Sequence, residues 1–471
     1  MIRGAVRFVD ERSGAAPFLK KTLRYVFPDH WSFLLGEVAL YCFILLVGTG
    51  VYLTLFFDDS RSQTVYHGSY RPLDGATMSH AYESVVHLSL DVRAGLLMRQ
   101  THHWAADVFL AAIVLHVLRV VFTGAVRKPR DLTYALGVTM LVLALLEGYL
   151  GYSMVDDLLS GMGLAIGYSV ALSLPFVGAK LAMLLWGGPY PGSPSFWPRM
   201  YIAHVLIIPI LIAAILTLHL ALVASRHHTQ FKKSPRETER TVVGLPTFPA
   251  QTPRSLGLMF GTWGVLFLLG GLAQINPIWL WGPYHVGDAT NGAQPDWYLG
   301  WLIGALRLVP SFDVVIGGYT VVPNPFWGGA LFPMVVIGIL YLWPWLERKL
   351  SGDTAFHNLL ERPRDNPTRT ATALAIVVWV FLVFMAGSAD RVYVWLGLSY
   401  SHQIWGYRVA VIVLPVVTWF VTRRVCRELL AGEIVTAVQE AAKHQPAPVR
   451  LSGPTDTVVA FPERPEQTPE L

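Results

Sequence analysis

The chain has 471 residues, of which 53% are hydrophobic and 14% are charged, and its formal net charge is only +5. With a mean hydropathy of +0.46, this composition predicts a polytopic membrane protein and excludes an ordinary pair of soluble domains. The basic clusters flank apolar segments, so we expect no nucleic-acid partner. Cys42 and Cys426 are too few for an iron–sulfur cluster, a redox pair or covalent haem attachment.

Eight apolar segments are long enough to cross a hydrocarbon core of ~30 Å, so we predict an all-α protein with eight transmembrane helices. The predicted spans are residues 31–56, 104–124, 133–154, 201–224, 256–274, 327–346, 370–388 and 406–422. Outside them we expect an amphipathic helix near residues 79–100. One or two surface-lying helices are expected around residues 164–186.

Basic residues alternate with the spans along the chain. Arg and Lys crowd the N-terminus, the C-terminal tail and the loops 127–130, 226–254 and 347–369, whereas the other long loops hold very few. The positive-inside rule therefore predicts a multi-pass membrane protein with both termini in the cytoplasm. The first 25 residues are basic and interrupted by polar residues, so we expect no cleaved signal peptide.

The polar, proline-bearing stretch between the fourth and fifth spans suggests a division of the chain. We predict an N-terminal four-helix half (1–225), a cytoplasmic linker (226–255), a C-terminal four-helix half (256–430) and a cytoplasmic tail (431–471). Residues 445–471 are rich in Pro, Glu and Thr, a composition that is typical of disordered segments.

Four histidines in two apolar segments carry the strongest functional signal. His102 and His116 are 14 residues apart, and His204 and His219 are 15 apart. On a helix these spacings correspond to roughly 21–23 Å of rise and bring each pair to nearly one face. Haem iron binds two axial imidazoles, so two such helices predict two b-type haems, one above the other. Any one of these histidines alone would fit a packing residue, a proton relay or a quinone ligand equally well.

The topology also predicts how the histidines pair. The second and fourth spans run in the same direction, so His102 should face His204 on the outer side and His116 should face His219 on the cytoplasmic side. The remaining histidines follow no such spacing. We interpret His103 as an interface residue and assign His227 and His228 to the cytoplasmic side.

Glycines repeat the histidine spacing in the first and third spans. Gly36 and Gly50 are 14 residues apart, and so are Gly137 and Gly151. Since glycine costs about 1 kcal/mol relative to alanine in a helix, these matched pairs suggest that a flat, bulky porphyrin packs against the backbone. Ordinary packing of small residues between membrane helices is the alternative.

Taken together, these features resemble the cytochrome b subunit of the quinol–cytochrome c reductase (cytochrome bc) complex. The run Asp91–His102 (DVRAGLLMRQTH) is similar to the family's entry to its second helix, and the histidine and glycine pairs match its haem positions. Pro295–Tyr298 (PDWY) resembles the family's quinol-site motif PEWY. The resemblance covers roughly residues 25–425. Residues 155–157 stand where the family commonly has PWG. The run Asp156–Gly161 (DDLLSG) and the PDWY variant resemble actinobacterial members, which implies a bacterial plasma membrane.

The resemblance implies specific roles for several residues. Asp296 would accept a proton from quinol, with burial raising its pKa, while Tyr298 and Tyr152 would donate hydrogen bonds or pack. Asp296 as a helix N-cap is the structural alternative. Arg99 and Arg119 lie about one turn from axial histidines and would pair with haem propionates, or else extend to the interface. For the cytoplasmic quinone site the sequence offers only Arg226, His227 and His228.

The resemblance also implies the activity: a proton-translocating quinol–cytochrome c reductase that oxidises quinol at an outer site. One electron would go to a Rieske iron–sulfur protein and the other through the two b haems to a quinone on the inner side. The implied partners are the Rieske protein, a c-type cytochrome subunit, quinone (menaquinone in an actinobacterial member) and membrane lipids. A homodimer of complexes is expected, with a terminal oxidase as a further candidate partner. A di-haem b anchor of a dehydrogenase or hydrogenase and a haem-free transporter are the alternatives.

Overall fold

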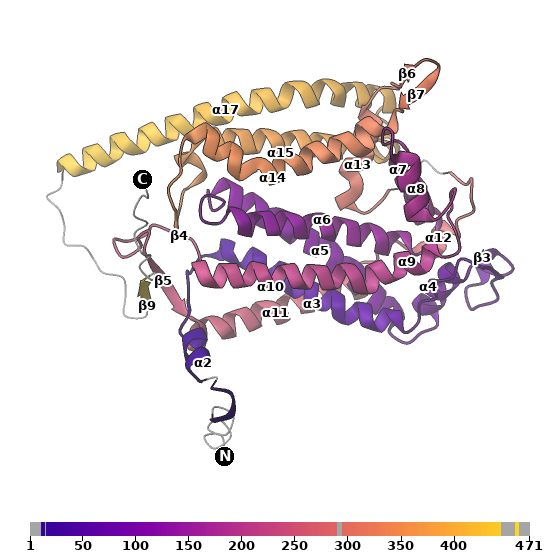
Figure 1. Ribbon diagram of the computed structural model, residues 1–471, viewed down its shortest axis with the longest axis horizontal. Helices are drawn as coiled ribbons and strands as arrows, with labels where there is room; N and C mark the ends of the chain where they lie inside the picture. The colour runs from indigo at the N-terminus through magenta and orange to yellow at the C-terminus, as the bar shows by residue number, and fades with distance from the viewer. Residues whose placement is uncertain (1–10, 15, 290–293, 444–456, 461–471) are drawn as a thin grey trace, which may run out of the picture.

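The computed structural model describes residues 11–14, 16–289, 294–443 and 457–460 of the chain. Within them, eight helical segments are long and apolar enough to span a membrane, and they confirm the eight predicted spans (Figure 1). These segments are Trp31–Thr54, Gly95–Phe122, Asp131–Ser153, Phe196–Arg226, Thr247–Leu272, Phe326–Ser351, Pro367–Gly387 and Tyr400–Thr436.

Sixteen α-helices are described, together with short 3₁₀ and π-helical turns. The α-helices are α2 (Ala16–Leu23), α3 (Leu34–Thr54), α4 (His80–Leu90), α5 (Gly95–Phe122), α6 (Asp131–Ser153), α7 (Leu158–Leu172), α8 (Gly178–Trp186), α9 (Phe196–Ile202), α10 (Ile208–Arg226), α11 (Thr252–Leu272), α12 (Ile278–Trp281), α13 (Gly300–Leu308), α14 (Phe332–Ser351), α15 (Pro367–Gly387), α16 (Ala389–Leu396) and α17 (Tyr400–Lys443). The 3₁₀ and π turns are η1 (Trp31–Phe33), η2 (Arg71–Leu73), η3 (Ala203–Ile207), η4 (Thr247–Gln251), η5 (Trp297–Leu299), η6 (Phe326–Leu331) and η7 (Pro363–Asp365).

The described strands are short and lie in the connections between helices. They are β1 (Val26–Phe27), β2 (Gln63–Val65), β3 (Thr77–Ser79), β4 (Gln230–Phe231), β5 (Thr241–Pro246), β6 (Val314–Ile316), β7 (Tyr319–Val322), β8 (Leu359–Leu360) and β9 (Thr457–Ala460). They pair as β1-β5-β9, β2-β3, β4-β8 and β6-β7, and only β4-β8 is parallel. The architecture is therefore helical, as predicted.

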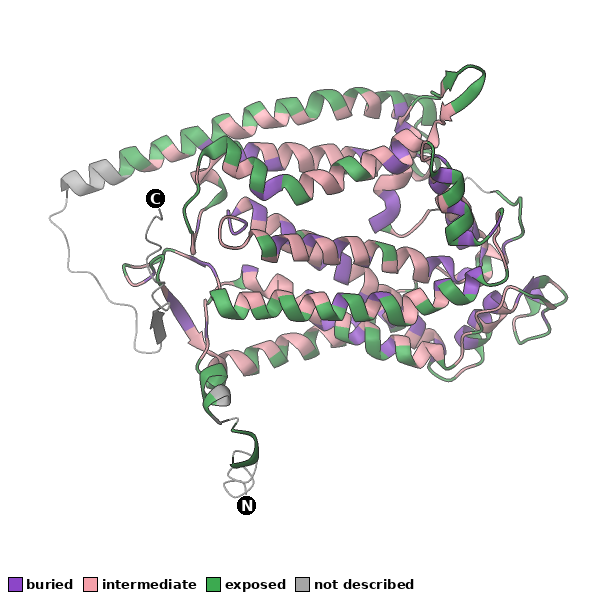
Figure 2. Cartoon of the chain, in the orientation of Figure 1, coloured by how far each residue is buried: buried purple, intermediate pink, exposed green. Residues whose placement is uncertain are grey.

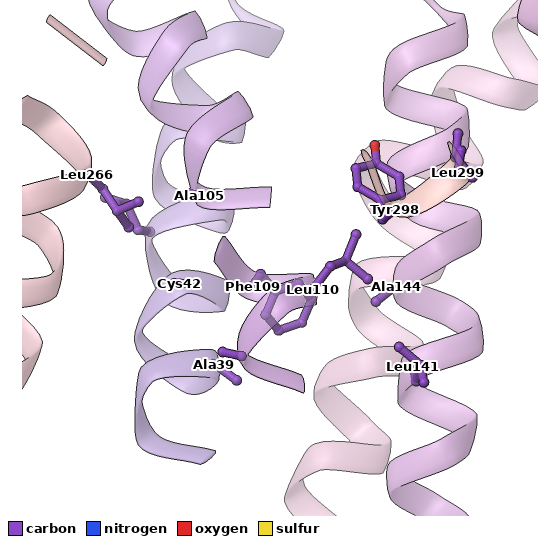
Figure 3. Close-up of a cluster of buried hydrophobic side chains, with 12 residues drawn as sticks. Ala39, Cys42, Ala105, Phe109, Leu110, Leu141, Ala144, Leu266, Tyr298 and Leu299 are labelled. Carbon is purple, nitrogen blue, oxygen red and sulfur yellow. The ribbon is translucent and has the colours of Figure 1, made fainter. Parts of the chain in front are cut away.

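Helix α5 lies at the centre of the molecule. It packs against α3, α6 and α11, and a cluster of buried side chains joins these helices to η5 (Figure 3). Cys42, Phe109, Leu266 and Tyr298 belong to this cluster. Because α11 contacts both α3 and α5, the C-terminal half begins with a helix that packs on the N-terminal half. The division at residues 226–255 stays a prediction.

The two ends of the helical bundle differ. Helices α4, α7, α8 and α12 gather at one end, and α2 lies with β4 and β5 at the other (Figure 1). The outward face of α10 is largely exposed (Figure 2), and its exposed side chains include Ile210, Leu211, Leu218 and Leu220. An exposed apolar stripe of this kind is what lipid contact requires.

The helix predicted at residues 79–100 is wrong in its extent. Helix α4 ends at Leu90, and α5 starts at Gly95 after Ala94, whose φ is +62°. A Cβ at Gly95 would collide with the carbonyl oxygen of Leu88, so the break needs glycine there. The second span therefore begins nine residues before the predicted residue 104.

The stretch around residues 164–186 contains two helices, α7 and α8, as expected. Both helices also pack against the start of the fourth span. Their side chains Leu164, Ala182 and Trp186 are buried in one apolar cluster with Phe196 and Trp197. Most of the predicted disordered tail, 445–471, lies outside the described residues. For Thr457–Ala460 the prediction is wrong, since this β-branched run pairs with β5 as strand β9.

Candidate functional site

The predicted outer pair of histidines lies face to face between α5 and the π-helical turn η3. The ring centroids of His102 and His204 are 6.4 Å apart. Metal–imidazole bonds are about 2 Å long, so two imidazoles on opposite sides of one metal ion have centroids roughly 6 Å apart. The pair therefore fits a single iron held by two axial imidazoles.

The other ring nitrogen of each outer histidine is already engaged. Nδ1 of His102 lies 2.9 Å from Oγ1 of Thr49, whose hydroxyl donates to the carbonyl oxygen of Leu45 at 2.8 Å. Nδ1 of His204 lies 3.1 Å from the carbonyl oxygen of Glu147 and 3.0 Å from its carboxylate Oε1. Acceptors at Nδ1 place the ring proton there and leave Nε2 free to bind a metal.

The predicted inner pair lines a single large cavity. His116 and His219 border a cavity of about 1090 Å³ together with Gly36, Gly137 and Arg119. Nδ1 of His219 donates to the carbonyl oxygen of Thr133 at 3.0 Å, whereas the buried Nδ1 of His116 has no hydrogen-bond partner among the described residues. An imidazole pair that borders a cavity of this size fits a bound macrocycle.

Each of the four predicted glycines lies against one of the four histidines. A Cβ built at Gly50 would be 3.3 Å from Cε1 of His102, and one at Gly36 would be 3.4 Å from Cε1 of His116. At Gly151 the distance to Cε1 of His204 would be only 2.5 Å, and at Gly137 the distance to Cε1 of His219 would be 3.8 Å. The structure thus describes contacts between these glycines and the imidazoles. Our expectation that the glycines pack against a porphyrin stays a prediction.

The unequal spacings of the two histidine pairs have a local explanation. His204 lies in η3, a π-helical turn within the fourth span, and His219 follows on α10. A π turn accommodates one extra residue, so a 15-residue spacing can present both rings to the same side as a regular 14-residue spacing does. Sequence periodicity alone does not reveal this turn.

Asp296 lies in a network of hydrogen bonds beside α5. Its Oδ1 is 2.7 Å from Nε2 of His103, and its Oδ2 accepts a hydrogen bond from Oη of Tyr298 at 3.0 Å. Asp296 precedes η5, but its side chain makes no capping hydrogen bond. The helix-cap interpretation therefore loses its support. His103, which we had interpreted as an interface residue, lies within α5 with a side chain only 14% exposed, and its assignment to the interface stays a prediction.

The pKa of Asp296 moves in the direction opposite to our expectation. Burial alone raises it, but the charge and hydrogen bond of His103 and the hydrogen bond from Tyr298 outweigh burial, so the pKa is lowered. The carboxyl group is consequently ionised, the state in which it can accept a proton. Burial and the neighbouring Asp296 charge raise the pKa of Tyr298 well above 10, so the phenol stays a neutral donor.

Two further residues of the spans, Tyr152 and Asp107, lie near this network without a hydrogen bond to Asp296. Oη of Tyr298 lies against Gly148 of α6, and Tyr152, one turn further along the same face, is buried. On α5, Asp107 follows His103 by one turn and has a buried Oδ1 without a hydrogen-bond partner among the described residues. We had not singled out Asp107, although an acidic residue inside an apolar span is a signal of function.

The two arginines predicted to pair with propionates differ in their surroundings. The guanidinium of Arg99 lies 3.4–3.5 Å from the carbonyl oxygen of Asn276 and over the ring of Trp279. Arg119 borders the inner cavity, with Nε 3.3 Å from Oγ of Ser32 and its guanidinium 4.3 Å from the ring centroid of Phe33. Their pairing with propionates stays a prediction.

The residues proposed for the inner quinone site border the same cavity as His116 and His219. Arg226, His227 and His228 all line it, and Nδ1 of His228 is 3.1 Å from Oη of Tyr25. Burial lowers the pKa of His228 to about 3, so this ring is neutral.

The sequence alone did not direct us to several other polar residues of this cavity: Tyr25, His30, Glu37 and Arg130. Burial, followed by the charges of Lys233 and Arg119, lowers the pKa of His30. Burial likewise lowers the pKa of Arg130 to about 10, and its guanidinium donates to the carbonyl oxygen of His227 at 3.0 Å. Tyr25, His30 and Glu37 lie within one stretch of 13 residues, whereas Arg130 precedes α6, so only the fold brings Arg130 to the other three.

Known proteins resemble the chain over most of its length. A protein-family model described as "Cytochrome b(N-terminal)/b6/petB" matches residues 107–283. The "Cytochrome bc1 complex cytochrome b subunit" of Corynebacterium diphtheriae is 46% identical over 440 residues, covering 91% of this chain and 80% of that protein. The protein of the same description from Streptomyces coelicolor is 43% identical over 419 residues, covering 89% and 76%. A solved structure described as "Hyperthermophilic respiratory Complex III" has the same fold, with a TM-score of 0.64 and 19% identity over 88% of this chain and 99% of that one.

The graded contacts of the glycines predict graded effects of substitution. Gly151→Ala should remove most of the outer haem, because the new Cβ would overlap the ring of His204 and overpacking costs about 1–3 kcal/mol. Gly137→Ala is the matched control: its Cβ would make an ordinary contact with His219, so the inner haem should remain. Haem content of the purified variants, measured by reduced-minus-oxidised spectra, checks this. Equal retention in both variants would contradict it.

Proposed function

The chain belongs to the cytochrome b subunits of the cytochrome bc1 complex, and from this we propose that it oxidises quinol at an outer site and reduces quinone at an inner site. The proposal includes the bifurcation of quinol electrons and coupling to proton translocation. The observation that carries it is the placement of two imidazole pairs at two levels, with an ionised carboxylate near the outer pair and a large, mainly apolar cavity around the inner pair.

At the outer site, the substrate chemistry requires a proton acceptor. Quinol becomes quinone by losing two protons and two electrons, and Asp296 is ionised and held by His103 and Tyr298. We assign to Asp296 the acceptance of one quinol proton at its carboxylate. Tyr298 orients that carboxylate. Tyr298 packs against Gly148 of α6, and Tyr152 lies on the same face of that helix.

Two b haems would be held as His102–His204 and His116–His219, and when bound they supply one-electron carriers at two levels of the membrane. Gly36, Gly50, Gly137 and Gly151 leave room for the four imidazoles. Acceptors at Nδ1 of three of the four histidines fix the ring orientation.

The inner haem would occupy the part of the inner cavity beside His116 and His219, and we propose that a quinone binds in the part beside His228 and Arg130. The apolar walls of the cavity accept the ring, while His228, Arg119 and Arg130 supply polar groups at its margin. Because His228 is neutral, its ring can donate or accept a hydrogen bond without carrying charge into the membrane.

The remaining features of the proposal concern assembly and location. One electron from quinol passes to a Rieske iron–sulfur protein and onward to a c-type cytochrome subunit, and menaquinone is the proposed quinone. We further propose a homodimer of complexes in the bacterial plasma membrane with both termini in the cytoplasm, as the distribution of basic residues supports. A terminal oxidase is a further candidate partner.

A di-haem anchor of a dehydrogenase or hydrogenase is the alternative function. Such an anchor needs the paired histidines but has no use for a carboxylate carried by the second half of the chain. The hydrogen bond between His103 on α5 and Asp296 in the loop before α13 joins the two halves at one site, and this favours quinol oxidation.

Removing one axial ligand tests the pairing. His116→Leu should abolish the inner haem and leave the outer haem, because His102 and His204 are untouched. The spectrum of the purified variant should therefore contain half of the b-type absorbance. Retention of both haems would refute the assignment.

Removing the charge of Asp296 tests the outer site. Asp296→Asn should slow quinol oxidation by roughly 10–1,000-fold, because the variant lacks the carboxylate that accepts the proton, while both haems stay bound. Reduction of the haems from the inner site should be unchanged, and this serves as the control. Near-normal quinol oxidation in the variant would show that another group accepts the proton.

The pH profile tests the partner of Asp296. A lowered pKa keeps the carboxylate ionised, and quinol oxidation fails as the pH falls through that pKa. In His103→Leu the pKa of Asp296 should rise, so the acid limb of the rate profile should move to higher pH. Unaltered haem spectra would show that the neighbouring His102 is intact. An unmoved acid limb would exclude His103 as the group that lowers this pKa.

A further inference from the structure

One carboxylate of a transmembrane helix lies in the wall of the inner cavity. Of the described residues that border this cavity, two are acidic, Asp29 and Glu37. Asp29 precedes the first span, has a side chain that is 67% exposed and pairs with Arg254. Glu37 lies on α3, within the span Trp31–Thr54. A carboxylate inside a membrane-spanning segment is costly and usually serves a function.

Three neutral donors hold the carboxylate of Glu37. Oη of Tyr41 donates to its Oε2 at 3.0 Å, and Oγ of Ser255 donates to the same oxygen at 2.8 Å. Nε2 of Gln251 donates to Oε1 at 3.4 Å. All three partners also border the cavity. Because a hydroxyl group both donates and accepts, Tyr41 and Ser255 can pass a proton between Glu37 and a neighbouring group.

Glu37 lies where the two parts of the cavity meet. Its neighbour Gly36 faces the imidazole of His116. Phe33 precedes Glu37 by one helical turn on the same side, and its ring centroid is 6.1 Å from that of His228. The carboxylate is therefore at the edge of the part in which we place the quinone.

The donors from the fifth span connect Glu37 with the end of the bundle that we assign to the cytoplasm. Gln251 directly precedes α11, and Ser255 lies in the first turn of that helix. Pro253 and Arg254, between these two donors, are exposed. Ser255 is thus next to residues that contact water, so the carboxylate can regain a proton from that side.

The two polar groups that border the quinone part are poor proton donors. Quinone becomes quinol by gaining two electrons and two protons, one on each oxygen. Burial lowers the pKa of His228 to about 3, so its ring is neutral and carries no surplus proton. Burial lowers the pKa of Arg130 only to about 10, so its guanidinium keeps its proton. A carboxyl group gives up its proton far more readily than a guanidinium does.

We propose that Glu37 protonates the quinone in the inner cavity. The O–H bond of its carboxyl group breaks and a new O–H bond forms at one quinone oxygen, while the electrons are those that the proposed function delivers to this site. The carboxylate regains a proton from the aqueous side through Ser255, and the second proton of the quinol comes from water at the cavity mouth. The inference rests on the proposed function, because it requires quinone reduction in this cavity.

The test is the oxidation of pre-reduced haem by a short-chain naphthoquinone in the purified complex. The parent protein and all variants carry Asp296→Asn, which slows the outer site. Glu37→Gln keeps the size of the side chain and an acceptor oxygen but has no carboxyl proton to give. Haem oxidation should slow by on the order of 100-fold, within the usual contribution of a positioned proton donor, while the apparent KM for the quinone stays unchanged.

Two controls separate proton delivery from a structural link between α3 and α11. Formate, a small acid that can enter the cavity, should raise the rate of Glu37→Gln but not that of the parent protein. Asp29→Asn removes the other carboxylate of the cavity wall and should leave the rate unchanged, because water reaches that position directly.

An exchange variant keeps the proposal testable if Glu37→Gln alone does not bind the inner haem. Glu37→Gln/Gln251→Glu preserves a hydrogen bond between the two side chains and returns a carboxylate to the cavity wall, so most of the rate should return. An unchanged rate in Glu37→Gln would overturn the inference. So would a slow Glu37→Gln, or a slow exchange variant, whose rate formate does not raise.

The same measurements separate this inference from the proposed function. If quinone oxidises the haem equally fast in the parent protein and in Glu37→Gln, only the role of Glu37 is refuted. If quinone does not oxidise the reduced haem of the parent protein at all, the proposed inner site itself is refuted.

Discussion

Four imidazoles are buried between membrane helices, and the arrangement of the surrounding chain follows from that burial. A polar ring inside a bilayer is costly unless its nitrogens are satisfied. Helices α3 and α6 provide acceptors for three of the Nδ1 atoms, and glycines on the same two helices give the rings space. What these contacts leave open is Nε2, the atom that would bind iron in the proposed haem sites. The bundle thus presents two ligand pairs at two depths.

The separation of the two imidazole pairs determines the energetic cost of the proposed electron transfer between them. The two axial histidines on α5 are 14 residues apart, which corresponds to roughly two-thirds of the hydrocarbon thickness. Moving an electron that far against the membrane potential costs on the order of 1.5 kcal/mol per 100 mV. A difference in potential between the two proposed haems has to offset that cost. In the proposed function, Asp296 and the inner cavity would carry the proton chemistry at the two ends.

Much of this arrangement can be predicted from the sequence. The lengths of the apolar segments determine the spans, and the period of the α-helix determines which histidines face one another. The eight spans, and the facing of His102 with His204, could be predicted in this way. The start of α5 could not, because Arg99, Gln100 and Thr101 are polar yet buried, and hydropathy excludes such residues from a span. The π turn around His204 is invisible to periodicity. The partners of Asp296 were missed as well, since His103 is 193 residues away in the chain and only the packing of η5 against α5 joins them.

The central claim is that each chain holds two haems through paired imidazoles. Quantitative reduced-minus-oxidised spectroscopy of the purified protein, combined with electron paramagnetic resonance of the oxidised form, measures this directly. The account predicts two low-spin, bis-imidazole b haems per chain that titrate at different potentials. One haem per chain, or two with a signature other than bis-imidazole ligation, would contradict it.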